Sequence, residues 1–202
     1  MKGPLQLRFV TSADRLDRLP ETRAELAVVG RSNVGKSSLL NALANQTRLA
    51  HVSKTPGRTR LLNAFLVDEA DLGRDATLVD CPGYGFAKAP KQMRGGWQRM
   101  IEGYLLGREE LVAILVLVDG EIGPTPLDVQ MVEWLRHHER PHVVIATKHD
   151  KVKASVRDKR KKELAGGLDL QPNEVVWVSA AKNVNIDRLR GLVRQWLAPA
   201  PP

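Results

Sequence analysis

Short runs of apolar residues alternate with segments of helical periodicity along most of the chain. Six such runs are rich in valine, isoleucine, leucine and alanine, and they span residues 25–30, 61–67, 76–83, 111–119, 142–150 and 174–180. Continuous apolar runs are typical of strands that are buried on both faces, as in a parallel sheet covered by helices. The pattern therefore predicts a sheet of about six strands.

Segments with helical signals separate these runs or follow the last of them. They span residues 36–45, 92–106, 125–138 and 155–168, and a final one begins near Asn185. The clearest start lies at Thr125, which predicts an N-cap followed by Pro126 at the first helical position and Asp128 at the third. Helices in these places can cover both faces of the predicted sheet.

The order of the elements predicts a doubly wound, three-layer α/β fold. A strand and a helix come first, two strands follow, and strand–helix pairs then alternate to the end. A short acidic loop over residues 68–75 joins two strands and allows a hairpin, so one strand is expected to run antiparallel in a mostly parallel sheet. We interpret residues 1–197 as one domain with a short N-terminal extension, and residues 198–202 as a disordered tail.

The composition mainly indicates the cellular compartment in which the protein is expected to work. The chain of 202 residues has a single cysteine, Cys81, which cannot form an internal disulfide and fits a reducing compartment. The N-terminus lacks the apolar segment of a signal peptide, and the longest apolar run, Leu111–Val118, is too short to cross a bilayer. We therefore expect a cytoplasmic protein with no membrane contact, and Cys81 as a small buried side chain.

Charge indicates a class of partner. The sequence has 31 lysines and arginines against 23 acidic residues, a net charge of +8. Between Lys148 and Lys162 there are eight basic residues and two aspartates. This concentration favours a polyanion such as RNA, although the basic run 157–162 also fits a solvated helix face.

The segment Gly30–Ser37 reads GRSNVGKS, directly after a predicted strand and at the start of a predicted helix. In this context Gly-x-x-x-x-Gly-Lys-Ser indicates a phosphate-binding loop, because its glycines let backbone N–H groups converge on the phosphates. Lys36 is expected to reach the β- and γ-phosphates, and the Ser37 hydroxyl to bind Mg²⁺.

The segment Thr147–Asp150, TKHD, lies at the carboxyl end of a predicted strand, where ligands bind in open α/β sheets. The Asp150 carboxylate can accept two hydrogen bonds from guanine N1–H and the 2-amino group, a pair of donors that adenine lacks. The stem of Lys148 can pack on the base, and the N–H of Ala180 can meet guanine O6. These residues favour a guanine nucleotide over the alternative of a kinase or ATPase.

Two further segments are expected at the γ-phosphate and Mg²⁺. Asp80 ends a predicted strand where a carboxylate can bind Mg²⁺ through water, and the N–H of Gly83 can meet the γ-phosphate. Thr55 and Thr59 are both candidates for a metal ligand from a switch loop, and we favour Thr59, because Gly57 gives the loop freedom to fold over the nucleotide.

These motifs, in this order, resemble those of the translation-factor-related GTPases. More narrowly, the chain is similar to the EngB (YihA/YsxC) family of bacterial ribosome-biogenesis GTP-binding proteins over about Phe9 to Leu197. The stretches TPGRT and PGYGFAKAP carry more of this resemblance than the phosphate-binding loop does. Arg60 stands where the family usually has glutamine, and Cys81 where leucine is common.

The resemblance implies a P-loop GTPase fold and a monomer that assists assembly of the large ribosomal subunit, contacts its RNA and proteins, and is needed for normal cell division and septation. It implies Mg²⁺ held by Ser37, Thr59 and, through water, Asp80, and catalytic roles for Lys36, Asn33, Thr59 and Gly83. The residues expected to line GTP or GDP are Gly30, Arg31, Ser32, Asn33, Val34, Gly35, Lys36, Ser37, Gly57, Arg58, Thr59, Arg60, Leu61, Asp80, Cys81, Pro82, Gly83, Thr147, Lys148, His149, Asp150, Val178, Ser179 and Ala180.

One position raises a question about catalysis. Tyr84 follows Gly83, whereas Ras-like GTPases have there the glutamine that orients the attacking water. A phenol is protonated at neutral pH, so we expect slow intrinsic hydrolysis without Tyr84 as general base. Asn33 is a candidate to recruit K⁺ as a substitute for an arginine finger. The alternatives are that Asn33 only caps its own turn, or that the ribosome orders the switch loops.

A different class of function also fits these residues. The protein could be an RNA-binding assembly module that uses GTP as a structural ligand and hydrolyses it negligibly. Single-turnover hydrolysis with and without ribosomal subunits separates this alternative from a GTPase switch.

Overall fold

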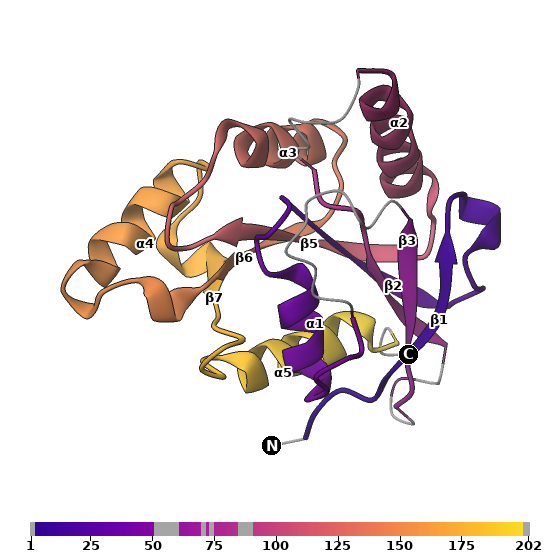
Figure 1. The fold of residues 1–202 in the computed structure, drawn as a ribbon, viewed down its shortest axis with the longest axis horizontal. Helices are drawn as coiled ribbons and strands as arrows, with labels where there is room; N and C mark the ends of the chain where they lie inside the picture. The colour runs from indigo at the N-terminus through magenta and orange to yellow at the C-terminus, as the bar shows by residue number, and fades with distance from the viewer. Residues whose placement is uncertain (1–2, 51–60, 70–71, 73–74, 85–90, 200–202) are drawn as a thin grey trace.

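The computed structural model describes residues 3–50, 61–69, 72, 75–84 and 91–199, without the side chains of residues 91–98. Within these residues the strands form one seven-stranded sheet in the order β1-β3-β4-β2-β5-β6-β7 (Figure 1). The strands are β1 Leu7–Ala13, β2 Ala24–Gly30, β3 Leu62–Val67, β4 Ala76–Asp80, β5 Leu111–Asp119, β6 His142–Thr147 and β7 Val175–Trp177.

The direction of the strands confirms a mostly parallel sheet. Strands β4, β2, β5, β6 and β7 pair in parallel with their neighbours in this order, whereas β3 is antiparallel to both β1 and β4. The hairpin expected across residues 68–75 is therefore present between β3 and β4. One strand runs against the rest, as the short loop predicted.

The expected number of strands was too low by one, because β1 was taken for an extension. This strand pairs only with β3, at the edge of the sheet, and its register shifts between Phe9 and Thr11. Only its first and last residues, Leu7 and Ala13, are buried, and Phe9 and Val10 are exposed. An edge strand of this kind has no continuous apolar run, which is the signal that identified the other strands.

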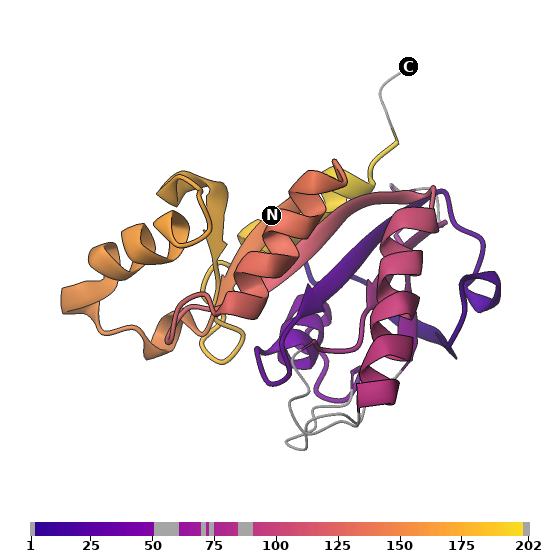
Figure 2. The same ribbon diagram turned by 90° about the horizontal axis from the view of Figure 1, so that it is seen from above.

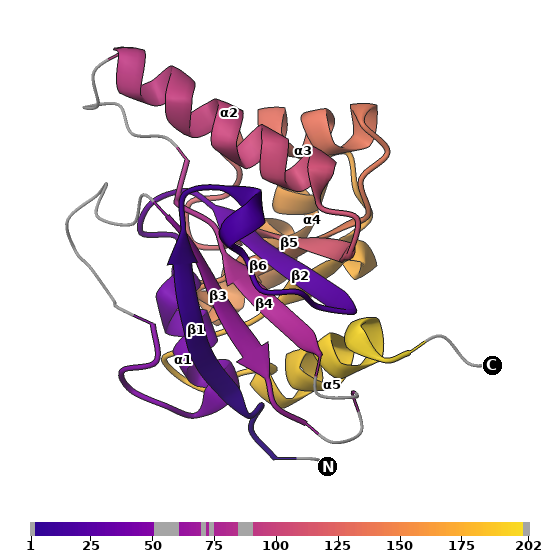
Figure 3. The ribbon, with the colours of Figure 1, turned by 90° about the vertical axis from the view of Figure 1, so that its right-hand side faces the viewer.

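Helices cover both faces of the sheet, which gives the predicted three layers. Apolar side chains of α1 and α5 pack in one core cluster, and those of α2, α3 and α4 pack in the other. Figures 1 and 3 show these two sets of helices on opposite sides of the strands. The bounds are α1 Lys36–Ala44, α2 Lys91–Gly107, α3 Pro126–His137, α4 Arg157–Gly166 and α5 Ile186–Leu197, with single 3₁₀ turns at Leu16–Arg18, His149–Lys151, Ala154–Val156 and Pro172–Glu174.

The start of α3 forms as the sequence predicts. Thr125 is the N-cap, and its backbone N–H and hydroxyl both donate to the Asp128 carboxylate, at 2.8 and 2.7 Å. Figure 2, which views the molecule from the side of this helix, shows α2 and α3 lying along the strands and α4 at the end of the molecule away from β1. None of the helices in the described part of the chain is long and apolar enough to span a membrane.

The beginning of the chain packs against its last helix. The Arg194 guanidinium on α5 donates to the carbonyl oxygen of Gly3 at 2.8 Å and forms an ion pair with Glu69 at 2.7 Å. The backbone N–H of Leu5 also donates to the carbonyl of Leu43 on α1. Residues near the two ends of the chain are thus joined through one arginine.

Candidate functional site

The segment from Gly30 to Ser37 forms a tight loop between β2 and α1. Gly35, just before the helix, has φ of 109°, a left-handed conformation that favours glycine. A Cβ atom at Gly30 would lie 2.9 Å from the Leu117 carbonyl oxygen, so a larger residue does not fit there. Lys36 begins α1 and its ammonium donates to the Gly30 carbonyl at 3.5 Å. The loop therefore curls back over its own lysine, as a phosphate-binding loop requires.

The segment after β4 lies directly against this loop. The N–H of Tyr84 donates to the Gly30 carbonyl at 3.2 Å, and the N–H of Ser32 donates to the Tyr84 carbonyl at 3.3 Å. A Cβ atom at Gly83 would lie 2.9 Å from the Ser32 nitrogen and 3.1 Å from Lys36 Nζ. The structure thus brings Gly83 beside the lysine that is expected at the γ-phosphate.

Asp80 ends β4 and is buried. Burial raises the pKa of its carboxyl to about 6, and the nearby Lys36 ammonium partly opposes this. Its Oδ1 atom has no hydrogen-bond partner among the described residues. A buried carboxylate oxygen without a partner is costly, and Mg²⁺ with its bound waters is a ligand that satisfies such an oxygen. Asp80 therefore fits a magnesium site, and Ser37, which is expected to be another ligand, lies in the first turn of α1.

The end of β6 connects the loop to the predicted base-binding residues. The buried Thr147 hydroxyl donates to the carbonyls of Val34, at 2.7 Å, and Val118. Asp150 follows in a short 3₁₀ turn, and its Oδ1 accepts a 2.5 Å hydrogen bond from the hydroxyl of Ser179 after β7. The segments Thr147–Asp150 and Val178–Lys182, which are separate in sequence, are therefore joined through this hydrogen bond.

Sequence reasoning missed the partner of Lys148. Its ammonium forms a 2.6 Å ion pair with Asp119, the last residue of β5, and Lys148 itself has φ of 55°. The other oxygen of Asp119 accepts the N–H of Glu121 at 3.0 Å. The sequence feature that could have identified Asp119 is its place as an acidic residue at the carboxyl end of an apolar run. That run is the strand β5, which pairs with β6, the strand that leads to Lys148. This ion pair holds the lysine stem in the position from which it can cover a base.

The Tyr84 side chain is buried in the core cluster that contains α2, α3 and α4. It is 6% exposed, and its hydroxyl donates to Asp128 Oδ1 at 2.9 Å. Burial and then the Asp128 charge raise the pKa of this phenol far above its ordinary value. This direction agrees with the prediction that Tyr84 stays protonated at neutral pH. The partnership with Asp128 was missed, since Asp128 was interpreted only as part of a helix start.

Part of the predicted site lies outside the described residues. This applies to the switch loop with Thr55, Gly57, Arg58, Thr59 and Arg60. Leu61, at its end, precedes β3 and is exposed. Cys81, within the segment after β4, is fully buried as expected.

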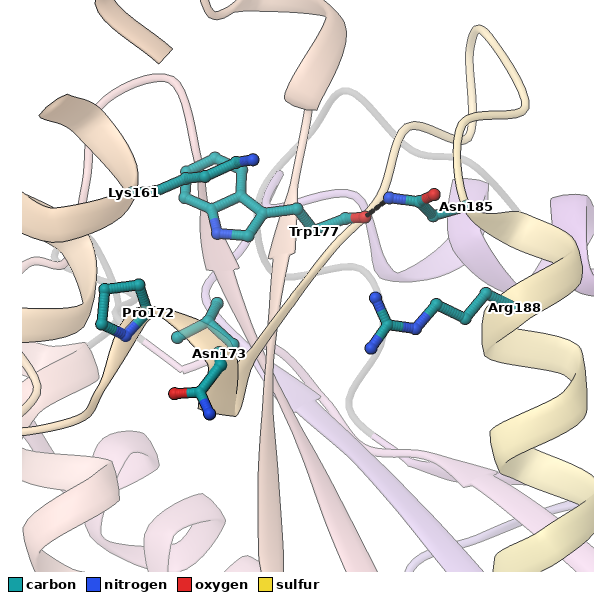
Figure 4. A pocket seen from close by; sticks show the side chains of 7 residues that line it. Lys161, Pro172, Asn173, Trp177, Asn185 and Arg188 are labelled. Atoms are coloured by element: carbon teal, nitrogen blue, oxygen red, sulfur yellow. Dashed lines mark hydrogen bonds between the residues drawn. The ribbon is translucent and has the colours of Figure 1, made fainter. Parts of the chain in front are cut away.

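A pocket of about 220 Å³ lies at the outer edge of β7, away from the phosphate-binding loop (Figure 4). The indole N–H of Trp177 is buried there and has no acceptor among the described residues. Two basic and no acidic side chains line the pocket, which consists of Lys161, Pro172, Asn173, Val175, Trp177, Asn185 and Arg188. Its chemistry suits a ligand with negative charge and hydrogen-bond acceptors.

Comparison with known proteins identifies the family. Residues 25–148 match the family model described as 50S ribosome-binding GTPase. A probable GTP-binding protein EngB from Pelotomaculum thermopropionicum is 46% identical over 191 residues, which cover 94% of this chain and 94% of that protein. The chain belongs to the EngB family of GTP-binding proteins. Membership decides against the kinase or ATPase alternative, because it makes the chain a GTP-binding protein of the GTPase class.

Solved structures agree with the EngB assignment. A crystal structure of a probable GTP-binding protein EngB has a TM-score of 0.69 and 25% identity, covering 86% of this chain and 98% of that one. A variant of Era from Aquifex aeolicus, bound to GDP and aluminium fluoride, has a TM-score of 0.68 and 27% identity, covering 88% of this chain and 57% of that one. The P-loop GTPase fold expected for the EngB family is therefore confirmed.

Proposed function

We propose that the protein is a slow GTPase that acts as a switch during assembly of the large ribosomal subunit. It works in the cytoplasm as a monomer, and normal cell division and septation depend on it. The observation that carries the proposal is the contact between two segments, the phosphate-binding loop and the segment Asp80–Tyr84 at the end of β4, which we call the nucleotide-sensing segments. In this contact Gly83 lies beside Lys36. A γ-phosphate between them would change how the second segment is held, which is what a switch requires.

Guanine recognition is assigned to the residues that follow β6 and β7 and are joined by the hydrogen bond from Ser179 to Asp150. Asp150 accepts hydrogen bonds from the base while Ser179 fixes its orientation, and Lys148, held by Asp119, covers the ring. The Ala180 N–H, in the same loop as Ser179, meets guanine O6. At the other end of the site, Ser37, Thr59 and, through water, Asp80 would hold Mg²⁺, which when bound would supply positive charge to the phosphates.

Slow hydrolysis follows from where Tyr84 points. Its phenol is bound to Asp128, so the position of the Ras-like glutamine offers no group that orients water. We assign K⁺, recruited through Asn33, to the stabilisation of charge between the phosphates, and Asn33 has the left-handed φ of 64° that lets this loop turn. Hydrolysis in KCl should exceed that in NaCl at equal ionic strength, and Asn33→Ala should remove the difference. A wild-type rate that ignores the cation would instead favour activation by the ribosome.

RNA contact is assigned to the end of the molecule formed by α4 and the pocket beside β7. The side chains of Lys151, Lys153, Lys159 and Lys162 are exposed there, and Lys161 lines the pocket. Burial and then the charges of Arg157 and Lys161 lower the pKa of His149, which Asp150 partly opposes, so two of these basic side chains lie close to the segment that holds Asp150. The name of the matched family model supports the large subunit as the partner.

The test is co-sedimentation with purified large-subunit particles. We expect the protein to sediment with them in a non-hydrolysable GTP analogue and to remain in the supernatant in GDP. Single-turnover hydrolysis should also accelerate when the particles are added. Equal sedimentation in both nucleotides, with hydrolysis unchanged, would favour an RNA-binding module that uses GTP only as a structural ligand.

A further inference from the structure

One buried carboxylate connects three parts of the molecule. Asp128 on α3 has no exposed side-chain surface and accepts four hydrogen bonds. Two come from the backbone and hydroxyl of Thr125 and complete the helix cap at Oδ2. The other two come from outside α3, from Tyr84 Oη to Oδ1 at 2.9 Å and from Arg31 Nε to Oδ2 at 3.1 Å.

The two outside donors belong to the segments that contact the phosphates. Arg31 is the second residue of the phosphate-binding loop, and Tyr84 comes immediately after Gly83. Their backbones also meet, since Arg31 and Tyr84 form a parallel β-bridge. Of the four hydrogen bonds to Asp128, the helix cap needs only the two from Thr125. The bonds to Arg31 and Tyr84 are additional, and they tie both phosphate-sensing segments to one point on α3.

We propose that Asp128 is a positioning residue for the γ-phosphate site: by holding the Tyr84 side chain in the core, it keeps Gly83 beside Lys36. This rests on the proposed function, in which Gly83 senses the γ-phosphate. The separation is small, since a Cβ on Gly83 would lie 3.1 Å from Lys36 Nζ. Releasing Tyr84 lets the adjacent Gly83 move away from the lysine, and only a nucleotide that has a γ-phosphate loses a contact when this happens.

The chain contains a matched control for this arrangement. Tyr104 on α2 is also buried and donates to a buried carboxylate, Glu25 Oε1, at 2.8 Å. That carboxylate also binds an arginine, Arg108, at 3.2 Å. Glu25 lies near the start of β2, at the opposite end of the strand from the phosphate-binding loop. Removing either tyrosine hydroxyl deletes the same kind of hydrogen bond, but only Tyr84 adjoins the nucleotide-sensing segment.

The experiment compares Tyr84→Phe with Tyr104→Phe. For Tyr84→Phe we expect the Kd of a non-hydrolysable GTP analogue to rise about tenfold, which is the effect of losing one hydrogen bond from Gly83 to the charged γ-phosphate. The affinity for GDP should be nearly unchanged, and kcat should be lower. Tyr104→Phe should lower the melting temperature and leave the ratio of GTP to GDP affinity as in the wild type. Asp128→Asn should also weaken the GTP analogue selectively, and adding it to Tyr84→Phe should give less than the sum of the two effects.

The outcomes separate this proposal from the function beneath it. If the wild type does not bind the GTP analogue, the proposed function fails. If the wild type binds it but Tyr84→Phe weakens GTP and GDP equally, or changes only thermal stability as Tyr104→Phe does, Asp128 has a structural role and the positioning proposal is wrong. Tighter binding of the analogue by Tyr84→Phe would also overturn the proposal, because the hydrogen bond would then hold Gly83 away from the phosphate.

Discussion

Cys81 lies between Asp80 and Gly83, so the only thiol of the chain is inside a nucleotide-sensing segment. Burial, reinforced by the charge of Asp80, raises the pKa of the thiol, and Lys36 only partly opposes this. At pH 8 the thiol therefore stays protonated and out of reach of an alkylating reagent. We expect iodoacetamide to modify the native protein at least ~100-fold more slowly than the unfolded protein in urea, because modification requires local opening.

Mass spectrometry of timed samples measures this reaction, with free N-acetylcysteine as the control for reagent activity. Saturating GTP analogue should slow it further, since the ligand binds only the closed segment. Modification of the native protein as fast as of the unfolded one would mean that Cys81 is accessible.

Asp150 is the residue to which we assign guanine recognition. Asp150→Asn replaces one acceptor with a donor that faces a donor on guanine, so GTP affinity should fall by roughly 3 kcal/mol or more. Xanthine nucleotides, with a carbonyl at position 2, should bind the variant better than guanine nucleotides do. Ser179→Ala is the control, because it removes the 2.5 Å bond that orients the carboxylate, together with the 3.1 Å bond from the Lys182 N–H to the same hydroxyl, and should keep the preference for guanine. Wild-type guanine affinity in Asp150→Asn would show that another group reads the base.

The residues assigned to the ligand are easier to propose from sequence than the residues that hold them in place. Asp150, Lys148 and Asp80 lie in short motifs whose spacing sets their chemistry. Their partners cannot be identified in this way, because Asp119 meets Lys148 only when β5 and β6 pair in register. Asp128 likewise reaches Tyr84 across 44 positions of the chain.

At the scale of elements, α4 and the turns before it form the basic surface assigned to RNA. Arg157 and Arg160 are partly engaged, because one donates to the Val152 carbonyl and the other lies 3.6 Å from Glu163. Lys159 also lies 3.8 Å from Glu163, but its side chain is 78% exposed against 32% for Arg160, so the exposed lysines are better targets. We replace four exposed lysines by glutamine: Lys151, Lys153, Lys159 and Lys162. A plot of the logarithm of the ribosome-binding constant against the logarithm of salt concentration should then become less steep, by up to about 3 in slope, because fewer counterions are released.

Sedimentation at several KCl concentrations measures that slope, and GTP affinity should stay unchanged. Arg15→Gln with Arg18→Gln provides a control on a surface away from α4, where both arginines are exposed and paired with aspartates. A slope equal to that of the wild type in the lysine variant would exclude this surface as the RNA contact.

Strands with buried side chains were predictable, including β7 at one edge of the sheet, and the mostly exposed edge strand β1 was not. The strands β2, β4, β5, β6 and β7 are buried on both faces and therefore have continuous apolar sequences. The strand β1 buries only its ends and pairs on one side, so its residues alternate too weakly to indicate a strand. The reversal of β3 was predictable because a loop of a few residues cannot cross from one end of a sheet to the other.

At the scale of the whole molecule, the order of strands decides where the ligand binds. The strand β2 is central, with β4 on one side and β5, β6 and β7 on the other. The residues assigned to phosphate and metal follow β2 and β4, and those assigned to the base follow β6 and β7. The sequence predicted that all of them lie at the carboxyl ends of strands. It did not predict on which side of β2 each of these strands lies, because strand order depends on contacts between distant segments.

The arginine that joins the first residues to the last helix has a consequence for the linear order of the chain. With Arg194 holding the Gly3 carbonyl at 2.8 Å, a short glycine-rich linker can connect the two ends. New ends can then be opened after the exposed Asp169, in the turn between α4 and β7. Because each strand would keep its neighbours, we expect this circular permutant to fold, to melt cooperatively and to bind GTP with an affinity close to that of the original chain. Loss of cooperative melting, measured by circular dichroism, would mean instead that folding requires the connection between α4 and β7.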